Sequence, residues 1–470
     1  MIPARGFTGK RVAVFGLGRS GLTAARSLKA GAALPVLWDE NEKARAAAVA
    51  EGFEVIDLMN IEWHDYAALV LAPGVPLTHP EPHWTVKSAK AAGVPVIGDI
   101  ELYAQTVALA PEMKKPKTVA ITGTNGKSTT TALVSWILKQ AGKDVRVGGN
   151  IGVGVLGLED THAGAIYVLE VSSYQLDLTR TFKPEVAVLL NLSPDHLDRH
   201  GDMAGYVAAK RRLFANQDAN DTAVIGVDDA WCQQICTELR GANRQTTRPI
   251  SAGRAVGGGV YVLQGVLYDA TGERAIEVAD LLRARSLPGK HNWQNAAAAY
   301  VAVRALGLSL EDAAEGLMSF PGLAHRMEEV ARIGRVRFIN DSKATNADAA
   351  RQALSSYPKV RWIAGGRAKA GGIDSLADLF PRVEHAYLVG EAADNFALAL
   401  GDRTPWTHCG DIATATARAY ADAVASGEDT VVLLSPACAS FDQFADFEER
   451  GEAFRAAALA LTPKAAAVGV

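Results

Sequence analysis

A glycine-rich stretch at residues 117–131 holds the side chains best suited to phosphate chemistry. It reads Lys-Thr-Val-Ala-Ile-Thr-Gly-Thr-Asn-Gly-Lys-Ser-Thr-Thr-Thr. The N–H groups of such a loop and the start of a following helix can face an anion, Lys127 adds a positive charge, and the Ser128 hydroxyl can hold Mg²⁺. We therefore predict that this loop binds the phosphates of a nucleotide, although Ile121 stands where the general pattern places a glycine.

The elements on either side of this loop suit that role. The β-branched run from Thr118 to Thr122 predicts a buried strand, and apolar residues spaced by three and four from Lys127 to Ala141 predict a helix that ends at Gly142. A surface turn capped by a serine or threonine is the alternative. The strand and the helix stand in the correct order, which disfavours it.

Three more polar side chains lie in or after predicted elements of the same region. Glu170 ends an apolar run, where a carboxylate can hold a metal ion beside the loop; the alternative is a carboxylate that faces water. His196 lies just past a strand predicted at residues 186–191, in the kind of loop that often carries function. Lys210 falls within a helix predicted at residues 203–214, and taken alone it is expected to be an ordinary solvated lysine.

A second glycine pattern lies near the start of the chain. Gly16, Gly18 and Gly21 follow an apolar strand, precede a helix and are followed by the acidic Asp39 about 20 residues later, which is the dinucleotide-binding fingerprint. The glycines let a diphosphate approach the helix, and Asp39 can bond a ribose or a uracil edge. NAD and a UDP-linked ligand both satisfy this pattern. Another glycine loop, at residues 72–76, also follows a predicted strand.

Length and element order predict the architecture. The 470 residues suggest about three domains. Strands alternate with helices throughout, so we expect an α/β fold in which each domain is a mostly parallel sheet with flanking helices. We place the domains at residues 1–112, 113–320 and 321–470, with the first boundary in a proline-containing linker at residues 108–116.

Charge and hydropathy exclude several classes of protein. The net charge of −4 disfavours nucleic acid as the main partner. No run approaches the roughly 18 apolar residues of a membrane span, and the first ten residues lack the apolar stretch of a signal peptide. The four cysteines show no zinc-ligand spacing, so we expect reduced thiols in a cytoplasmic protein.

Taken together, these motifs make nearly the whole chain resemble the Mur ligase family. The loop at residues 122–129 is similar to the shortened phosphate-binding loop of that family, which accounts for Ile121. Further segments look like its shared motifs: residues 149–152, 170–175, 195–198, 291–295 and 325–326. Two segments resemble the branch that adds D-glutamate: residues 340–346 and 435–444.

The resemblance implies a fold and a reaction. The fold has an N-terminal Rossmann-like domain, a central P-loop ATPase-like domain and a C-terminal Rossmann-like domain. The reaction is ATP-dependent amide formation, in which the terminal carboxylate of UDP-N-acetylmuramoyl-L-alanine is phosphorylated and the acyl phosphate is attacked by the amine of D-glutamate. Such a reaction belongs to cytoplasmic peptidoglycan precursor synthesis.

The resemblance also implies roles for individual residues. Catalytic roles fall on Lys127, His196, Lys210, Arg326 and Lys343. Contacts to ATP fall on Gly123, Thr124, Asn125, Gly126, Lys127, Ser128, Thr129, Asn292, Asn295, Arg326 and Asp341. Contacts to the UDP-linked substrate fall on Leu17, Asp39, Gly74, Asn150, Gln175 and His196. D-glutamate is surrounded by Lys343, Thr345, Lys369, Ser440 and Phe441. Two Mg²⁺ ions are held near Ser128, Glu170, His196 and Lys210, the last as a carbamate, which replaces the solvated interpretation of that lysine.

Other functions stay open from the sequence. A related amide ligase, such as a folylpolyglutamate synthase or a Mur ligase for another amino acid, belongs to the same superfamily. An NAD-dependent dehydrogenase explains the fingerprint at residues 16–21 but leaves the phosphate-binding loop and the residues around Lys343 unexplained. A nucleotide-binding regulator leaves Glu170, Lys210 and His196 without a task. We expect a monomer.

Overall fold

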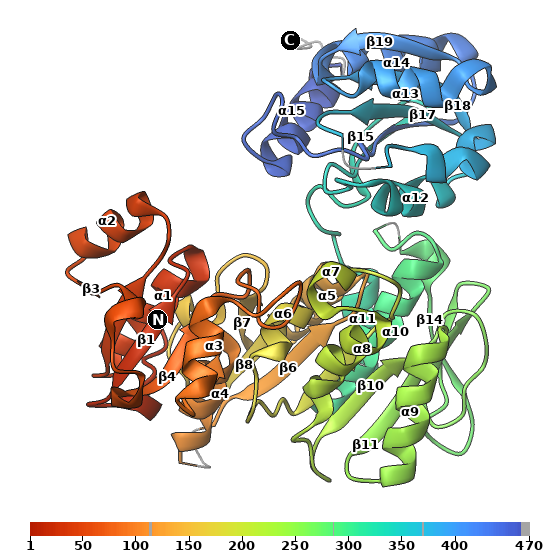
Figure 1. Cartoon of the computed structure of the whole chain (residues 1–470). Coiled ribbons are helices and arrows are strands. Elements are labelled where there is room, and N and C mark those ends of the chain that lie inside the picture. Colours follow the sequence, from red (N-terminus) through yellow and green to blue (C-terminus); the bar gives the residue numbers. More distant parts are fainter. Residues whose placement is uncertain (112–114, 285, 369–370, 462–470) are drawn as a thin grey trace, which may run out of the picture. The chain divides into compact units, whose positions relative to one another are not determined.

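The computed structural model describes residues 1–111, 115–284, 286–368 and 371–461. It contains three sheets, each flanked by helices, as predicted (Figure 1). The first two sheets belong to one compact unit, Met1–Ala284 with Lys290–Phe320, and the third belongs to a second unit made mainly of the residues from Pro321 onward. Within the described residues, no helix is long and apolar enough to cross a membrane.

The first sheet is parallel throughout and has the strand order β3-β2-β1-β4-β5. The order reverses beside β1, so the loops after β1 and β4 open at a switch point, where such sheets bind ligands. Its strands are β1 (Arg11–Phe15), β2 (Leu34–Trp38), β3 (Glu54–Val55), β4 (Tyr66–Leu71) and β5 (Val96–Ile97). Its helices are α1 (Arg19–Ala30), α2 (Glu42–Ala50), α3 (Trp84–Ala91) and α4 (Asp99–Leu109).

The second sheet has the order β14-β13-β12-β11-β10-β9-β6-β8-β7 and is parallel from β7 to β12. Its strands are β6 (Lys117–Thr122), β7 (Asp144–Gly149), β8 (Ala165–Glu170), β9 (Val186–Leu189), β10 (Thr222–Gly226), β11 (Thr246–Ser251), β12 (Val260–Leu263), β13 (Val266–Asp269) and β14 (Ile276–Asp280). Its helices are α5 (Lys127–Gln140), α6 (Ser173–Asp177), α7 (Leu197–His200), α8 (Met203–Arg211), α9 (Ala230–Ala242), α10 (Lys290–Ala305) and α11 (Leu310–Met318). The central strands β6, β8 and β9 are almost wholly buried, as their apolar sequences require.

The third sheet has the order β15-β16-β20-β17-β18-β19, and only the edge strand β15 is antiparallel. Its strands are β15 (Glu328–Ile333), β16 (Val336–Asn340), β17 (Val360–Gly365), β18 (Val383–Val389), β19 (Trp406–Gly410) and β20 (Thr430–Leu434). Its main helices are α12 (Ala347–Ser355), α13 (Ala393–Leu400), α14 (Ile412–Ser426) and α15 (Phe447–Ala460). The sequence predicts a final helix after Phe454, whereas α15 begins seven residues earlier, because the Asp446 side chain caps it by accepting from the N–H of Glu449.

The first two sheets share one hydrophobic core, and buried carboxylates on α4 join them. The fully buried Glu101 accepts hydrogen bonds from the N–H groups of Arg180 (2.7 Å) and Thr181 (2.9 Å) and from the Thr181 hydroxyl. Asp99 accepts from the side-chain amide of Gln175. The linker predicted at residues 108–116 is shorter than expected, because α4 continues through Leu109. Residues 112–114 lie outside the described part of the chain.

Candidate active site

The predicted phosphate-binding loop lies between β6 and α5. Gly126 has φ +84°, and a Cβ there would lie 2.2 Å from the Asn295 side-chain oxygen, so only glycine fits. The Lys127 ammonium lies across the loop and donates to the carbonyls of Gly123 (2.9 Å) and Thr124 (2.8 Å). Residues 127–129 form the first turn of α5, whose N–H groups point towards an anion placed at the loop.

Ser128 and Glu170 meet beside this loop. The Ser128 hydroxyl donates to one Glu170 carboxylate oxygen at 2.6 Å, and the Asn150 side-chain amide donates to the other at 2.8 Å. Both Ser128 and Glu170 are buried, and β8 places Glu170 opposite Ile121 of the neighbouring β6. A hydroxyl and a carboxylate next to nucleotide phosphates are the donors that Mg²⁺ takes in such sites. No cluster of three His, Cys, Asp or Glu side chains that could hold a metal occurs among the described residues. Ser128 and Glu170 would supply two of the oxygen ligands of such an ion.

Lys210 is buried, and the solvated interpretation of this residue is wrong. Only 2% of it is exposed, and its ammonium donates to the Thr122 hydroxyl (3.2 Å) and to the carbonyl of Gly123 in the phosphate-binding loop (3.0 Å). Burial, and then the nearby charge of Lys127, hold the pKa of Lys210 well below its usual range. A lysine that loses its proton readily is a nucleophile, and here it stands within reach of the loop.

His196 lies in the loop after β9, with the left-handed backbone that its φ of +53° gives. Its ring nitrogen Nδ1 lies 2.8 Å from the Tyr174 hydroxyl. Burial lowers the pKa of His196. The positive charges of Lys127 and Lys210 also lower this pKa, whereas the negative charge of Asp195 raises it. The imidazole is therefore neutral at pH 7 and can accept a proton.

The residues predicted for the UDP-linked substrate fall into two groups. At the carboxyl ends of β1 and β2, the Leu17 N–H donates to the Asp39 carboxylate at 2.5 Å. Gly74 lies in the loop after β4, and its carbonyl accepts from Arg199 at 2.6 Å. Asn150 binds Glu170 and the buried Gln175 binds Asp99, so these two side chains take part in contacts within the protein. The roles of all these residues towards the substrate stay predictions.

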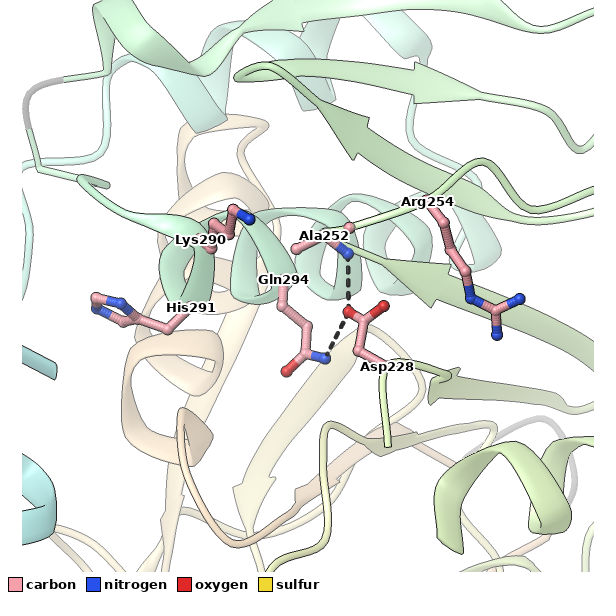
Figure 2. A pocket seen from close by; sticks show the side chains of 7 residues that line it. Asp228, Ala252, Arg254, Lys290, His291 and Gln294 are labelled. Atoms are coloured by element: carbon pink, nitrogen blue, oxygen red, sulfur yellow. Dashed lines mark hydrogen bonds between the residues drawn. The ribbon is translucent and has the colours of Figure 1, made fainter. Parts of the chain in front are cut away.

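A pocket of about 460 Å³ opens beside the start of α10. Figure 2 shows that the Asp228 carboxylate at its centre accepts from the Ala252 N–H (2.8 Å) and from the Gln294 side chain (3.3 Å), while His291 points away from Asp228. Burial lowers the pKa of His291 to about 4. The pocket is lined by Asp228, Ala252, Gly253, Arg254, Lys290, His291 and Gln294.

The sequence prediction missed half of this pocket. The motif at residues 291–295 lies at the start of α10, where the side chains of Asn295 and Asn292 lie 3.2 Å apart, but no role was predicted for residues 223–285. The signal that could have found the other wall is positional, since the loops after β10 and β11 open at the same edge of the sheet as the phosphate-binding loop. Gln294 joins the two regions, because its side-chain oxygen accepts from Asn191, which in turn binds the N–H of Asn125.

The predicted residues of the second unit gather at the ends of β16 and β20. Asp341 is buried, accepts from the Ser435 hydroxyl at 2.8 Å, and has its pKa raised to about 7 by burial, against the attraction of Arg326. The Lys343 ammonium lies 3.6 Å from the centre of the Phe447 ring, and the backbone N–H of Lys343 donates to the carbonyl of His325.

Three further predicted residues lie in the second unit. Ser440 is buried in the loop after β20, the neighbouring Phe441 is 63% exposed, and Thr345 donates its N–H to the carbonyl of Lys343. An exposed aromatic ring that follows a buried hydroxyl, in the same unit as the partly exposed Lys343, suits a small polar ligand. Lys369 lies outside the described residues.

Comparison with known proteins identifies the family of this chain. The model described as "Mur ligase middle domain" matches residues 121–303, and "Mur ligase, glutamate ligase domain" matches residues 325–438. A relative from Caulobacter sp. (strain K31), named UDP-N-acetylmuramoylalanine–D-glutamate ligase, is 72% identical over 99% of both chains. This chain belongs to the Mur ligase family. A Phenylobacterium zucineum (strain HLK1) relative of the same name is 67% identical over 97% of both chains.

Solved Mur ligases share the fold. The UDP-N-acetylmuramate–alanine ligase MurC from Thermotoga maritima aligns with a TM-score of 0.56 at 17% identity, covering 95% of this chain and 98% of its own. MurF from Acinetobacter baumannii aligns with a TM-score of 0.57 at 18% identity, covering 97% of this chain and 93% of its own. At such identities these Mur ligase structures support the three-sheet architecture only.

Proposed function

We propose that this protein is the ATP-dependent ligase that joins D-glutamate to UDP-N-acetylmuramoyl-L-alanine. One observation carries the chemistry: the phosphate-binding loop, the Ser128–Glu170 pair and the buried Lys210 meet at the ends of β6 and β8. The choice of amino acid is supported by the name of relatives that are 67–72% identical over almost the whole chain.

In this proposal, ATP binds with its phosphates on the loop at residues 123–129. Lys127 meets the β- and γ-phosphates, and its charge offsets the negative charge that grows during phosphoryl transfer. The pocket beside α10 receives the nucleotide base, since its lining residue Gln294 is joined to Asn125 of the loop through Asn191. Mg²⁺ bound near Ser128 and Glu170 supplies charge neutralisation for the phosphates.

Lys210 acts as a carbamate in this proposal. Its neutral amine forms an N–C bond to CO₂ and releases one proton, which turns a cation into a carboxylate-like anion. The lowered pKa of Lys210 supports this step, because burial favours the unprotonated amine that attacks CO₂. The carbamate, with His196 nearby, would hold a second Mg²⁺.

The ligation then proceeds in two displacements. A carboxylate oxygen of UDP-N-acetylmuramoyl-L-alanine bonds to the γ-phosphorus and the bond to ADP breaks. The amine of D-glutamate next attacks the acyl carbon, and the tetrahedral intermediate loses phosphate and a proton. We assign Leu17, Asp39 and Gly74 to the UDP-linked substrate, Arg326 and Asp341 to ATP, and Lys343, Thr345, Ser440 and Phe441 to D-glutamate, whose two carboxylates call for cations and hydroxyls.

The remaining expectations belong to the same proposal. We place the protein in the cytoplasm, where the nucleotide-linked substrate is made, and expect a monomer with domains at residues 1–112, 113–320 and 321–470. Asn150, Gln175 and Lys369 complete the predicted substrate contacts.

An amino-acid panel tests the function. Purified protein is incubated with ATP, Mg²⁺ and UDP-N-acetylmuramoyl-L-alanine, and phosphate release is measured with D-glutamate, L-glutamate, L-alanine or meso-diaminopimelate. We expect release to depend on D-glutamate. Turnover that prefers another amino acid would assign the protein to a different ligase, and NAD binding without ATP turnover would support a dehydrogenase.

A further inference from the structure

Helix α15 carries a fully buried arginine that no proposed step uses. Arg450 is 2% exposed, and its Nε donates to the Ser342 hydroxyl at 3.0 Å. Its Nη2 donates to the carbonyls of Ser342 (2.8 Å) and Cys438 (3.0 Å). Nη1 is buried and has no hydrogen-bond partner among the described residues, and a Cβ built on Gly366 would lie 3.2 Å from it.

These contacts join two loops that follow neighbouring strands, and a third loop passes close to the guanidinium group. Ser342 follows β16 and lies between Asp341 and Lys343, while Cys438 follows β20 and lies two residues before Ser440. Gly366 follows β17 and has φ +126°, which lets the backbone pass close to the arginine. Because β16, β20 and β17 are adjacent in the sheet, one guanidinium group spans all three strand ends.

Gly451, the residue after Arg450, lies against a fourth segment, which contains His325. The carbonyl of Gly451 accepts from the Asn340 side chain at 3.0 Å, and the same amide lies 3.0 Å from the His325 ring. A Cβ on Gly451 would lie 2.1 Å from His325 Nδ1, so a larger residue would displace that ring. The pair Arg450–Gly451 thus touches every segment of this unit to which we assign a substrate contact in the described residues.

The electrostatics indicate that Arg450 has a task beyond filling the core. Burial lowers the pKa of Arg450 to about 10, so the group stays charged at neutral pH. No carboxylate lies within ion-pair distance of it in the described part of the chain, and Asp442 attracts it only from farther away. A buried charge without a counter-ion is costly, and a methionine or leucine would fill the same space without that cost.

We propose that Arg450 is a positioning residue for the D-glutamate site, acting through the loops of Ser342, Cys438 and Gly366. It fixes the separation between Lys343 on one loop and Ser440 and Phe441 on another, while its own nitrogen atoms stay out of reach of the substrate. The inference rests on the proposed function, since it names a device for binding the incoming amino acid.

Steady-state kinetics with four proteins test this proposal: wild type, Arg450→Met, Ser342→Ala and Phe454→Leu. Arg450→Met removes all the bridging hydrogen bonds, so we expect the KM for D-glutamate to rise about tenfold or more, the usual effect of losing bonds from a charged donor. Ser342→Ala removes the acceptor of Nε, together with the hydrogen bond that this hydroxyl donates to the Phe447 carbonyl, but keeps both bonds of Nη2, so it should raise the same KM by a smaller factor. The KM for UDP-N-acetylmuramoyl-L-alanine should change by less than about twofold in both variants, because its assigned residues belong to the other unit.

Phe454→Leu is the matched control for lost stability. Phe454 is fully buried on the same helix and packs against Phe338, away from the three loops. It should lower Tm without changing the KM for D-glutamate. The proposal is overturned if Arg450→Met and Ser342→Ala lower Tm but leave that KM unchanged, or if Phe454→Leu raises it as much at an equal loss of Tm. Wild type without D-glutamate-dependent turnover would instead overturn the proposed function.

Discussion

At the scale of single residues, Lys210 is the position where burial and chemistry meet most closely. An unmodified lysine ammonium there gives up most of its hydration for a hydroxyl, a carbonyl and the face of Tyr206. A carbamate would change the sign of this charge beside a metal site. The unmodified lysine is a cation and the carbamate is an anion, so the two forms predict different effects when Lys210 is replaced.

We predict that Lys210→Ala lowers kcat by at least about a hundredfold, since it removes a charged group from the phosphoryl-transfer site. Acetate or another small carboxylate should restore part of the rate. Lys139→Ala, an exposed lysine near the end of α5, is the control and should leave the rate unchanged. Unaltered activity in Lys210→Ala would exclude the carbamate.

Asp341 gives a prediction for pH. Burial raises its pKa from 3.8 to about 7, so the folded state holds a proton that the unfolded state releases. Its contribution to stability is complete below about pH 3.8 and is lost as the pH rises through about 7. Asp341→Asn has no proton to lose, so its Tm should rise relative to wild type between pH 4 and pH 8, reaching a difference of several degrees. Calorimetry at several pH values checks this, and a Tm difference that does not vary with pH would contradict it.

The sequence predicted the site residues whose roles follow from local pattern. Ser128 and Glu170 stand at the start of a helix and the end of a strand, and the structure places them 2.6 Å apart. The burial of Lys210 was not predictable from its helix, because it depends on how α8 packs beneath the end of β6. Asp228 and Arg254 were missed for a similar reason, since two loops distant from α10 in sequence form one pocket with it.

At the scale of elements, apolar strands and amphipathic helices were predicted well. The strand expected at Thr118–Thr122 is β6, Lys117–Thr122, and the helix expected from Lys127 to the stop at Gly142 is α5, Lys127–Gln140. The start of α15 was missed because Glu448, Glu449 and Arg450 interrupt the apolar pattern of its first turns and Gly451 has a low helix propensity. The close approach to His325 explains why a glycine stands there.

An arginine in the short helix α7 joins two segments of the first unit. Arg199 donates to the carbonyls of Gly74 (2.6 Å) and Val75 (2.8 Å) in the loop after β4. Its guanidinium also lies 4.7 Å from the centre of the Tyr174 ring, whose hydroxyl contacts His196. The loop predicted to meet the UDP-linked substrate is therefore tied to a predicted catalytic side chain.

We predict that Arg199→Met raises the KM for UDP-N-acetylmuramoyl-L-alanine about tenfold, because charged hydrogen bonds to that loop are lost. Arg211→Met serves as the control, since Arg211 pairs with Glu238 on the surface and should not affect the KM. Steady-state kinetics with the UDP-linked substrate varied provide the measurement. An unchanged KM in Arg199→Met would show that the loop holds its shape without the arginine.

At the scale of the whole molecule, the alternation of strands and helices predicts the three sheets. It does not predict which sheets form one compact unit. The first two sheets share a core across which the buried Glu101 on α4 holds residues 180–181. A carboxylate in the first turn of a helix gives no sign in the sequence of a partner some 80 residues away. Local pattern therefore predicts domains, whereas long-range polar contacts decide which domains form one unit.

The central claim is that the chain activates a carboxylate with ATP before an amine attacks it. Oxygen transfer tests this claim most directly. UDP-N-acetylmuramoyl-L-alanine labelled with ¹⁸O in its terminal carboxylate is incubated with the protein, ATP and D-glutamate, and the released phosphate is analysed by mass spectrometry. The account predicts one ¹⁸O atom in each phosphate formed, because the acyl–oxygen bond breaks when the amide forms. Amide product accompanied by unlabelled phosphate would contradict it.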